Sequence, residues 1–124
     1  MKQLFVLAFV LSSACTSFTP RFDAEERVVL GQAQVIGETI FKVRNHFGWE
    51  LSEVCPTVFW TDDVIEDVHG KKFAGLTYSC SEIYVWQSGP AENTALEHEI
   101  KHCLRLWELG DGDAGHQEKE LWDL

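Results

Sequence analysis

The chain has 124 residues, and its 20 acidic and 10 basic side chains give a formal net charge of -10 at pH 7. Proteins that bind phosphate backbones need basic patches, so this charge argues against a nucleic-acid partner. The length suffices for one domain with one hydrophobic core and is too short for two. We expect residues 1–14 to be a signal peptide, residues 15–21 a tether and residues 22–124 a single domain.

The N-terminal segment has the three-part layout of a secretory signal. Lys2 gives a basic start, Leu4 to Leu11 form an apolar run too short to span a membrane, and Ser12 to Ala14 give a small-residue end. The residues before Cys15 also resemble a bacterial lipobox, although Leu lies one position too far from the cysteine. We expect export, either as a lipoprotein held at a membrane or in the periplasm through lipidated Cys15, or as a secreted protein after ordinary cleavage.

The first element of the domain is a predicted backing helix from Ala24 to Phe47. Apolar residues recur there among polar ones, Asp23 is suited to cap the helix and Gly48 to stop it. Gly31 and Gly37 argue against an unbroken helix, because each costs about 1 kcal/mol relative to Ala inside a helix.

Three short strands are predicted next, at Thr57–Thr61, Phe73–Tyr78 and Glu82–Trp86. These runs are rich in β-branched and aromatic residues, and Ser79 to Ser81 form a turn between the last two. They predict a small, three- to four-stranded and mainly antiparallel sheet, and hence an α+β fold. The same composition is found in the strands of any α+β domain, so the strands alone indicate no function.

A second helix is predicted to begin near Pro90 and to end at Gly110. Proline suits the first position of a helix, and glycine is the usual residue just past its end. A stripe at the spacing of a core-facing surface runs along this helix and comprises Leu96, Ile100, Cys103, Leu104 and Trp107.

Away from that stripe, residues 98 to 102 read H-E-x-x-H. Residues four apart on a helix lie within about 40° of each other, so His98 and His102 can reach one cation. The carboxylate of Glu99 can then hold a water beside that cation. The alternative is a solvated polar face whose His and Glu side chains bind nothing.

A catalytic zinc ion usually takes three protein ligands and leaves a fourth position for water. His116 is the best candidate for the third ligand, because the glycine-rich turn at Gly110–Gly115 can bring its imidazole back under the helix. Asp111 and Asp113 are candidates for accepting the second N–H of a ligand histidine.

With these residues, the chain resembles a small zincin metallopeptidase over roughly residues 57 to 116. The resemblance implies Zn²⁺ as cofactor, His98 and His102 as ligands, Glu99 as general base, and a peptide or protein as substrate. It also implies a minimal zincin-like fold, with a backing helix and a small sheet before the active-site helix. If the strand at residues 73–79 is the edge of the sheet above the cleft, an extended peptide can pair with it.

The zincin subfamily is not determined, because residues near the C-terminus resemble different subfamilies. Arg105 and Glu108 stand where the metzincin extension has a glycine and its third ligand. His116 followed by Trp122 is similar to the SprT-like branch, whereas Glu118 and Glu120 resemble the late glutamate of gluzincins.

The cysteines also bear on the compartment. If Cys15 is lipidated, Cys55, Cys80 and Cys103 allow one disulfide and one free thiol in an oxidising compartment, and the sequence does not say which pair forms. Cys103 lies on the core-facing stripe, and we expect it to be a core residue.

The function predicted from these residues is a zinc-dependent hydrolase, a metallopeptidase that uses a zinc-activated water and Glu99 as general base. Tyr78, Tyr84 and His69 are candidates for a second oxyanion donor, each with an ordinary structural alternative. One competing hypothesis is a catalytically inactive, exported or lipid-anchored binding protein on a zincin-like scaffold. Another is a structural zinc site with four protein ligands.

Overall fold

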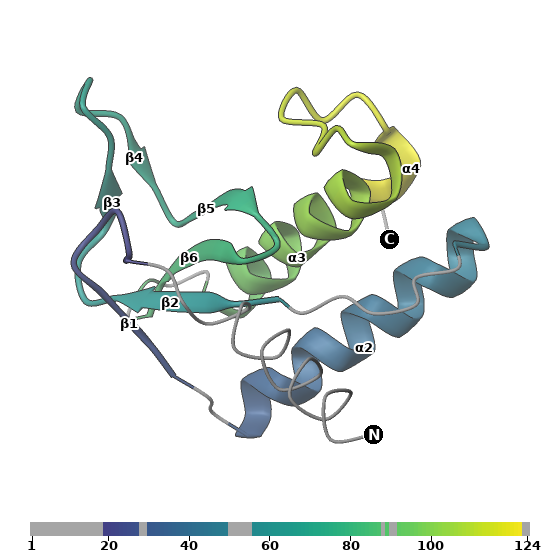
Figure 1. Ribbon diagram of the computed structural model, residues 1–124, viewed down its shortest axis with the longest axis horizontal. Helices are drawn as coiled ribbons and strands as arrows, with labels where there is room; N and C mark the ends of the chain where they lie inside the picture. The colour runs from purple at the N-terminus through teal and green to yellow at the C-terminus, as the bar shows by residue number, and fades with distance from the viewer. Residues whose placement is uncertain (1–18, 28–29, 50–55, 88, 90–91, 123–124) are drawn as a thin grey trace, which may run out of the picture.

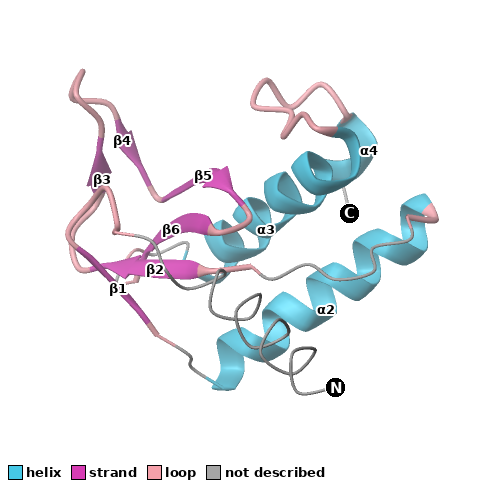
Figure 2. Ribbon diagram, viewed as in Figure 1, coloured by secondary structure: helices cyan, strands magenta, loops and turns pink. Residues whose placement is uncertain are grey.

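The computed structural model describes residues 19–27, 30–49, 56–87, 89 and 92–122 (Figure 1). The predicted signal peptide, Cys15 and Cys55 lie outside these residues. The element order is β1 (Ala24–Glu26), α2 (Leu30–Phe47), β2 (Val58–Thr61), β3 (Ile65–Glu66), β4 (Lys72–Phe73), β5 (Gly75–Ser79), β6 (Glu82–Trp86), α3 (Glu92–Leu109) and α4 (Lys119–Trp122). The two long helices lie against a small sheet (Figure 2), so the predicted α+β class is confirmed. Within the described part of the chain, no helix combines the length and apolar character needed to cross a bilayer.

The main sheet has four strands in the order β1-β2-β6-β5. Strands β1 and β2, and likewise β5 and β6, pair antiparallel, whereas β2 and β6 pair parallel with Val58 opposite Ile83 and Thr61 opposite Trp86. The sheet is therefore mixed, and β5 is one of its edges. The predicted strand at Phe73–Tyr78 is divided, because Lys72 and Phe73 pair instead with β3 in a separate two-stranded ribbon.

The predicted start of the first helix is wrong. Residues Ala24–Glu26 form strand β1, which pairs with Thr61, Trp60 and Phe59 of β2, and α2 begins only at Leu30. Pairing with β2 satisfies the main-chain groups of this segment at the sheet edge, and this tertiary contact overrides the local helix signal. Asp23 consequently caps no helix. The predicted stop is confirmed, since Gly48 follows α2 with φ of 66°.

The main core lies between the sheet and the two long helices. From α3, the predicted stripe contributes Leu96, Ile100, Cys103 and Leu104, each 0 % exposed. Trp107 departs from the prediction, because it lies in the last turn of α3, away from the sheet, and is 50 % exposed. The opposite face of the sheet packs a smaller apolar cluster of Phe59, Ile65 and Tyr84, covered by the β3–β4 ribbon and the segment before β1.

A disulfide between Cys80 and Cys103 joins the β5–β6 turn to α3. Cys103 is thus a core residue, as predicted, and also a disulfide partner, whereas the sequence had left the pairing of the cysteines open. The bond crosslinks the edge of the sheet to the helix that carries the H-E-x-x-H motif. It therefore restrains the position of strands β5 and β6 relative to helix α3.

Candidate metal centre

The structure brings three histidines together at one point. Helix α3 supplies His98 and His102, which lie one turn apart, and the loop between α3 and α4 supplies His116. The Nε2 atom of His98 lies 3.1 Å from that of His102 and 3.1 Å from that of His116, and the remaining pair is 3.2 Å apart. Three ring nitrogens thus converge at mutual distances that one metal ion can bridge.

These distances fit a tetrahedral metal ion. Ligand nitrogens at about 2.0–2.1 Å from zinc are separated by about 3.3 Å in a tetrahedron, close to the spacing observed. The Nδ1 atom of His102 lies 2.6 Å from the carbonyl oxygen of Gly112, and because a carbonyl only accepts, this nitrogen must donate. In the neutral ring the Nε2 of His102 then carries a lone pair, which is directed toward the other two imidazoles.

The surroundings of the two helical histidines favour the neutral imidazole, which is the form that binds metals. Burial, and then the nearby charges of His102, His116 and Lys101, lower the pKa of His98 to about 4. Burial also lowers the pKa of His102, against the opposing effects of the Gly112 carbonyl and the Asp113 charge. The site can therefore present unprotonated ring nitrogens at neutral pH.

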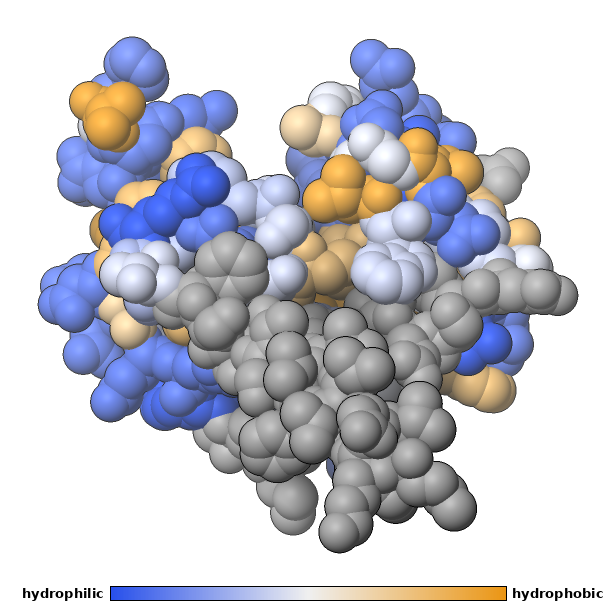
Figure 3. Space-filling model, in the orientation of Figure 1, coloured by the Kyte–Doolittle hydropathy of each residue, from blue (hydrophilic) through white to orange (hydrophobic). Residues whose placement is uncertain are grey.

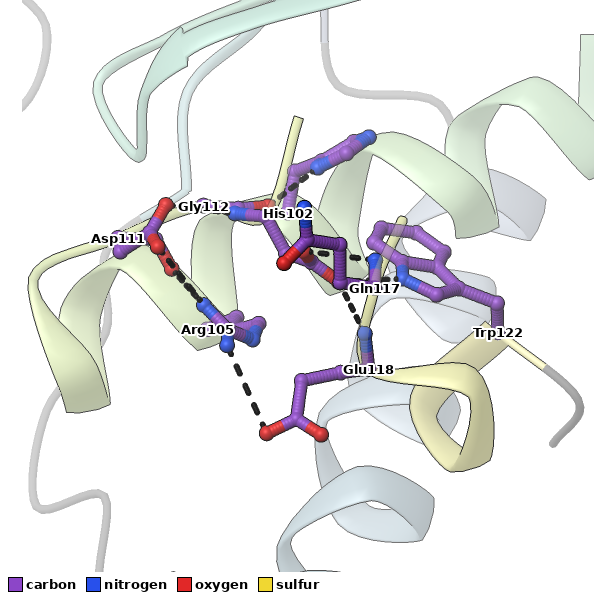
Figure 4. A network of polar contacts seen from close by, with 8 residues as sticks. His102, Arg105, Asp111, Gly112, Gln117, Glu118 and Trp122 are labelled. Carbon is purple, nitrogen blue, oxygen red and sulfur yellow. Dashed lines mark hydrogen bonds and ion pairs between the residues drawn. The ribbon is translucent and has the colours of Figure 1, made fainter. Parts of the chain in front are cut away.

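The loop after α3 folds back onto the helix, and this brings His116 to the other two histidines. Gly110 ends the helix with φ of 74°, and Asp113 and His116 also adopt the left-handed region, with φ of 55° and 54°. Arg105 of α3 holds the loop from the helix side, with its Nη1 donating to the carbonyl oxygen of Asp111 at 2.5 Å and its Nη2 3.5 Å from the carboxylate of Glu118 (Figure 4).

The two candidate aspartates have a different role from the expected one. The ring N–H of His102 is accepted by the main chain of Gly112, and among the described residues neither Asp111 nor Asp113 hydrogen-bonds to an imidazole. Asp111 accepts from the main-chain N–H of Asp113 at 3.0 Å and lies 3.6 Å from Arg105. Both acids organise the loop, and neither holds a histidine ring by a hydrogen bond.

Glu99 is placed beside this cluster, under the sheet edge. Its side chain is nearly buried, and the hydroxyl of Thr77 in β5 lies 2.9 Å from its Oε1 and 3.1 Å from its main-chain oxygen. Burial raises the pKa of Glu99 to about 7, against the lowering effect of the Thr77 hydrogen bond. A carboxyl group with this pKa can both accept and release a proton near neutrality, as a general base must.

Gly75 makes room for that carboxyl group. A Cβ atom at Gly75 would lie 3.0 Å from Oε2 of Glu99 and only 2.8 Å from its Cγ, and the second distance is closer than real Cβ contacts allow. The sequence did not identify Gly75 or Thr77 as site residues. The period-two alternation of a strand places both on the same face, so the signal was present, but nothing in the sequence showed that this face meets α3.

A groove with a volume of about 490 Å³ runs over the site. Its floor includes the three histidines and Glu99, one wall is strand β5, and the β3–β4 ribbon and the α3–α4 loop stand at its sides. Figure 3 shows a hollow between the β3–β4 ribbon and the α3–α4 loop. Apolar side chains line much of it, namely Phe73, Leu76, Tyr78, Leu106 and Ala114.

Of the three candidate oxyanion donors, only Tyr78 lines the groove. The Tyr84 hydroxyl is buried, donates to Glu82 at 2.7 Å and accepts from the main-chain N–H of Arg21 at 2.7 Å. Burial is the largest cause that raises the pKa of Tyr84 to about 12. His69 lies in the turn between β3 and β4, and neither His69 nor Tyr84 lines the groove.

No protein-family model matches the chain, and no curated protein or solved structure matches it either. The chemistry of the site is therefore the basis for assigning a function.

Proposed function

We propose that this protein is a zinc-dependent hydrolase, and specifically a metallopeptidase. The observation that carries the proposal is the convergence of three Nε2 atoms within 3.2 Å beside a nearly buried glutamate, on the floor of a groove. Burying a carboxyl group without a cationic partner costs free energy, and carboxyl groups whose pKa is shifted in this way cluster at functional sites. This favours a hydrolase over an inactive binding protein on the same scaffold.

Zinc is the metal that the donor set suits best. Three neutral imidazoles without sulfur or carboxylate ligands are typical of a catalytic zinc site with one open position. Among the described residues, no fourth His, Cys, Asp or Glu joins the group, which argues against a closed structural site. When bound, zinc would supply Lewis-acid activation of a water and of the substrate carbonyl.

Glu99 would act as the general base. Its carboxylate would take a proton from the attacking water and pass it to the amine that leaves when the peptide bond breaks. Thr77 holds one carboxylate oxygen, and the space left by Gly75 admits the other. These two β5 residues would fix the orientation of the carboxylate that takes up the proton.

The edge of the sheet supports a peptide or protein as the substrate. Strand β5 ends the strand order β1-β2-β6-β5, so one side of its main chain is not paired within the sheet. An extended polypeptide can add to such an edge by main-chain hydrogen bonds, and its scissile bond would then lie over the histidines. The apolar walls of the groove would accept uncharged side chains on both sides of that bond.

We infer that the protein acts outside the cytoplasm, either in the periplasm or held at a membrane through lipidated Cys15, or as a secreted enzyme. The Cys80–Cys103 disulfide supports export, because disulfides persist mainly in oxidising compartments. The acidic charge of the whole chain supports the absence of a nucleic-acid partner.

The first test is the metal content of the purified protein, measured by mass spectrometry without added zinc. We expect one zinc ion per chain in the wild type and its loss in His98→Ala, His102→Ala and His116→Ala. Glu99→Gln should keep the zinc and lower the rate of peptide hydrolysis by about 10²–10⁴-fold, the usual contribution of a general base. A wild-type protein that takes up no zinc, even when it is supplied, would exclude the proposed function.

A further inference from the structure

Trp122 lies against all three histidines. The centroid of its indole ring is 4.6 Å from the ring of His98, 4.4 Å from that of His102 and 4.5 Å from that of His116. The histidines line the groove, whereas Trp122 is not among the residues that line it. The indole therefore lies behind the imidazoles, on the side away from the groove.

Asp113 holds this indole in place. Its Oδ2 accepts a hydrogen bond from Nε1 of Trp122 at 2.9 Å and a second from the main-chain N–H of Glu118 at 2.7 Å. Its Oδ1 accepts from the main-chain N–H of Gln117 at 2.8 Å. Figure 4 shows Trp122, Gln117 and Glu118 gathered around this point.

One carboxylate thus fixes two parts of the site. It restrains the main chain of the two residues that follow His116, and it orients the ring against which His116 packs. His116 needs this support more than the helical histidines, since it comes from a loop and its side chain is exposed. Restraining an exposed ligand before the metal binds lowers the conformational entropy lost on binding.

We propose that Trp122 is a positioning residue of the metal centre and that Asp113 locks it there. The indole is the back wall of the site: it sets the orientation of the three imidazoles and keeps water from reaching the ion from behind. An ion held by these histidines would then be accessible only from the groove, where Glu99 lies. This inference rests on the proposed metal centre and extends it to a residue that touches neither the substrate groove nor the metal.

Metal affinity measured by competition with a chelator tests this directly on the full chain. We expect Trp122→Ala and Asp113→Asn to bind Zn²⁺ about 10–100-fold more weakly than the wild type, the usual effect of losing a partner that orients metal ligands. Trp107→Ala is the matched control, because Trp107 is half exposed in the last turn of α3 and does not line the groove. It should bind Zn²⁺ as the wild type does.

The absorption spectrum of the Co²⁺-loaded protein adds a readout that general destabilisation does not move. We expect a four-coordinate spectrum for the wild type and Trp107→Ala, and a changed shape and intensity for Trp122→Ala. An unchanged affinity and an unchanged cobalt spectrum in Trp122→Ala would overturn the proposal.

A conservative variant keeps the proposal testable if Trp122→Ala does not fold. Co²⁺ should quench part of the tryptophan fluorescence in the wild type and in Trp107→Phe, and that part should be missing in Trp122→Phe. Equal quenching in Trp122→Phe would overturn the placement of the indole. If the wild type bound zinc but hydrolysed no peptide, only the proposed peptidase activity would be refuted. The metal affinities of the variants would still decide the role of Trp122. A wild type that binds no metal would refute both proposals.

Discussion

Gly75 and Glu99 are packed together so closely that a single methyl group does not fit between them. A Cβ atom built at Gly75 lies 2.8 Å from Cγ and 3.2 Å from Cδ of Glu99. The edge strand β5 and helix α3, which carries the motif, are therefore in close contact at the Glu99 carboxyl group, which we propose as the general base. The Cys80–Cys103 disulfide joins the same two parts of the fold a few residues further along.

Gly75→Ala should reduce peptide hydrolysis while zinc stays bound. The added methyl group forces the Glu99 side chain to move, because the three atoms nearest to that Cβ position all belong to Glu99. Because small misplacements of a catalytic group can cost about 10²-fold in rate, we expect a loss of that order in kcat. Steady-state kinetics together with metal analysis would measure both quantities.

The matched control for this variant is Gly37→Ala in α2, where a Cβ atom meets nothing within 4 Å. Alanine is favoured over glycine inside a helix by about 0.5–1 kcal/mol, so this variant should be slightly more stable and fully active. If Gly75→Ala kept wild-type activity, the position of Glu99 would not depend on the space beside β5.

Arg105→Gln should weaken metal binding through the loop. The change removes the hydrogen bond to the carbonyl oxygen of Asp111 and the ion pairs with Asp111 and Glu118, which hold the loop against α3. We expect Zn²⁺ affinity to fall by about tenfold, the lower end for groups that support metal ligands from outside. Arg44→Gln removes the same charge from α2 and should leave the affinity unchanged. Equal affinities of the two variants would show that the loop keeps its shape without Arg105.

Removal of the disulfide should destabilise the fold substantially. The bond closes a loop with a sequence separation of 23 residues, for which the lost restraint on the unfolded chain amounts to about 3 kcal/mol. The double variant Cys80→Ala/Cys103→Ala should show this loss in the free energy of unfolding, measured by urea denaturation. A reducing agent should destabilise the wild type similarly and have no effect on the double variant. If the reducing agent destabilised the wild type and the double variant equally, the disulfide would not be the source of the stabilisation.

The sequence predicted the helix of the site well because its signals are local. Glycine at its end, apolar residues at helical spacing and the H-E-x-x-H motif all lie within one continuous segment. The approach of His116 was also predictable, since a glycine-rich turn precedes it. Prediction failed where the outcome depends on distant contacts: β1 exists because β2 offers it an edge, and Trp107 is exposed because α3 extends away from the sheet.

The supporting residues of the site were hidden for the same reason. Thr77 and Gly75 are ordinary strand residues until β5 is known to lie against Glu99. Asp113 was considered as a partner for a histidine, because carboxylates often fill that position, yet the main chain of Gly112 fills it instead. Its actual partner, Trp122, is nine residues further along and meets it only after the chain has turned twice through left-handed conformations.

Acid should loosen the α3–α4 loop through Asp113. Burial opposes the charged form of this carboxyl group, but hydrogen bonds from Trp122, Glu118 and Gln117, together with the charge of Arg105, outweigh it and lower its pKa to about 2. A carboxyl group whose pKa is lower in the folded state stabilises that state above its ordinary pKa of 3.8, and this contribution is lost as the pH falls toward 2.

We therefore expect the tryptophan fluorescence of the metal-free wild type to change between about pH 3 and pH 2, below the pKa of about 4 of His98, whose ring also contacts Trp122. Asp113→Asn does not titrate and should lack this change, whereas Asp111→Asn should retain it, because the Asp111 carboxylate does not bind the indole. If Asp113→Asn showed a transition with the same midpoint, another group would be responsible for the acid sensitivity. The Asp113 carboxylate would then not be what orients the indole.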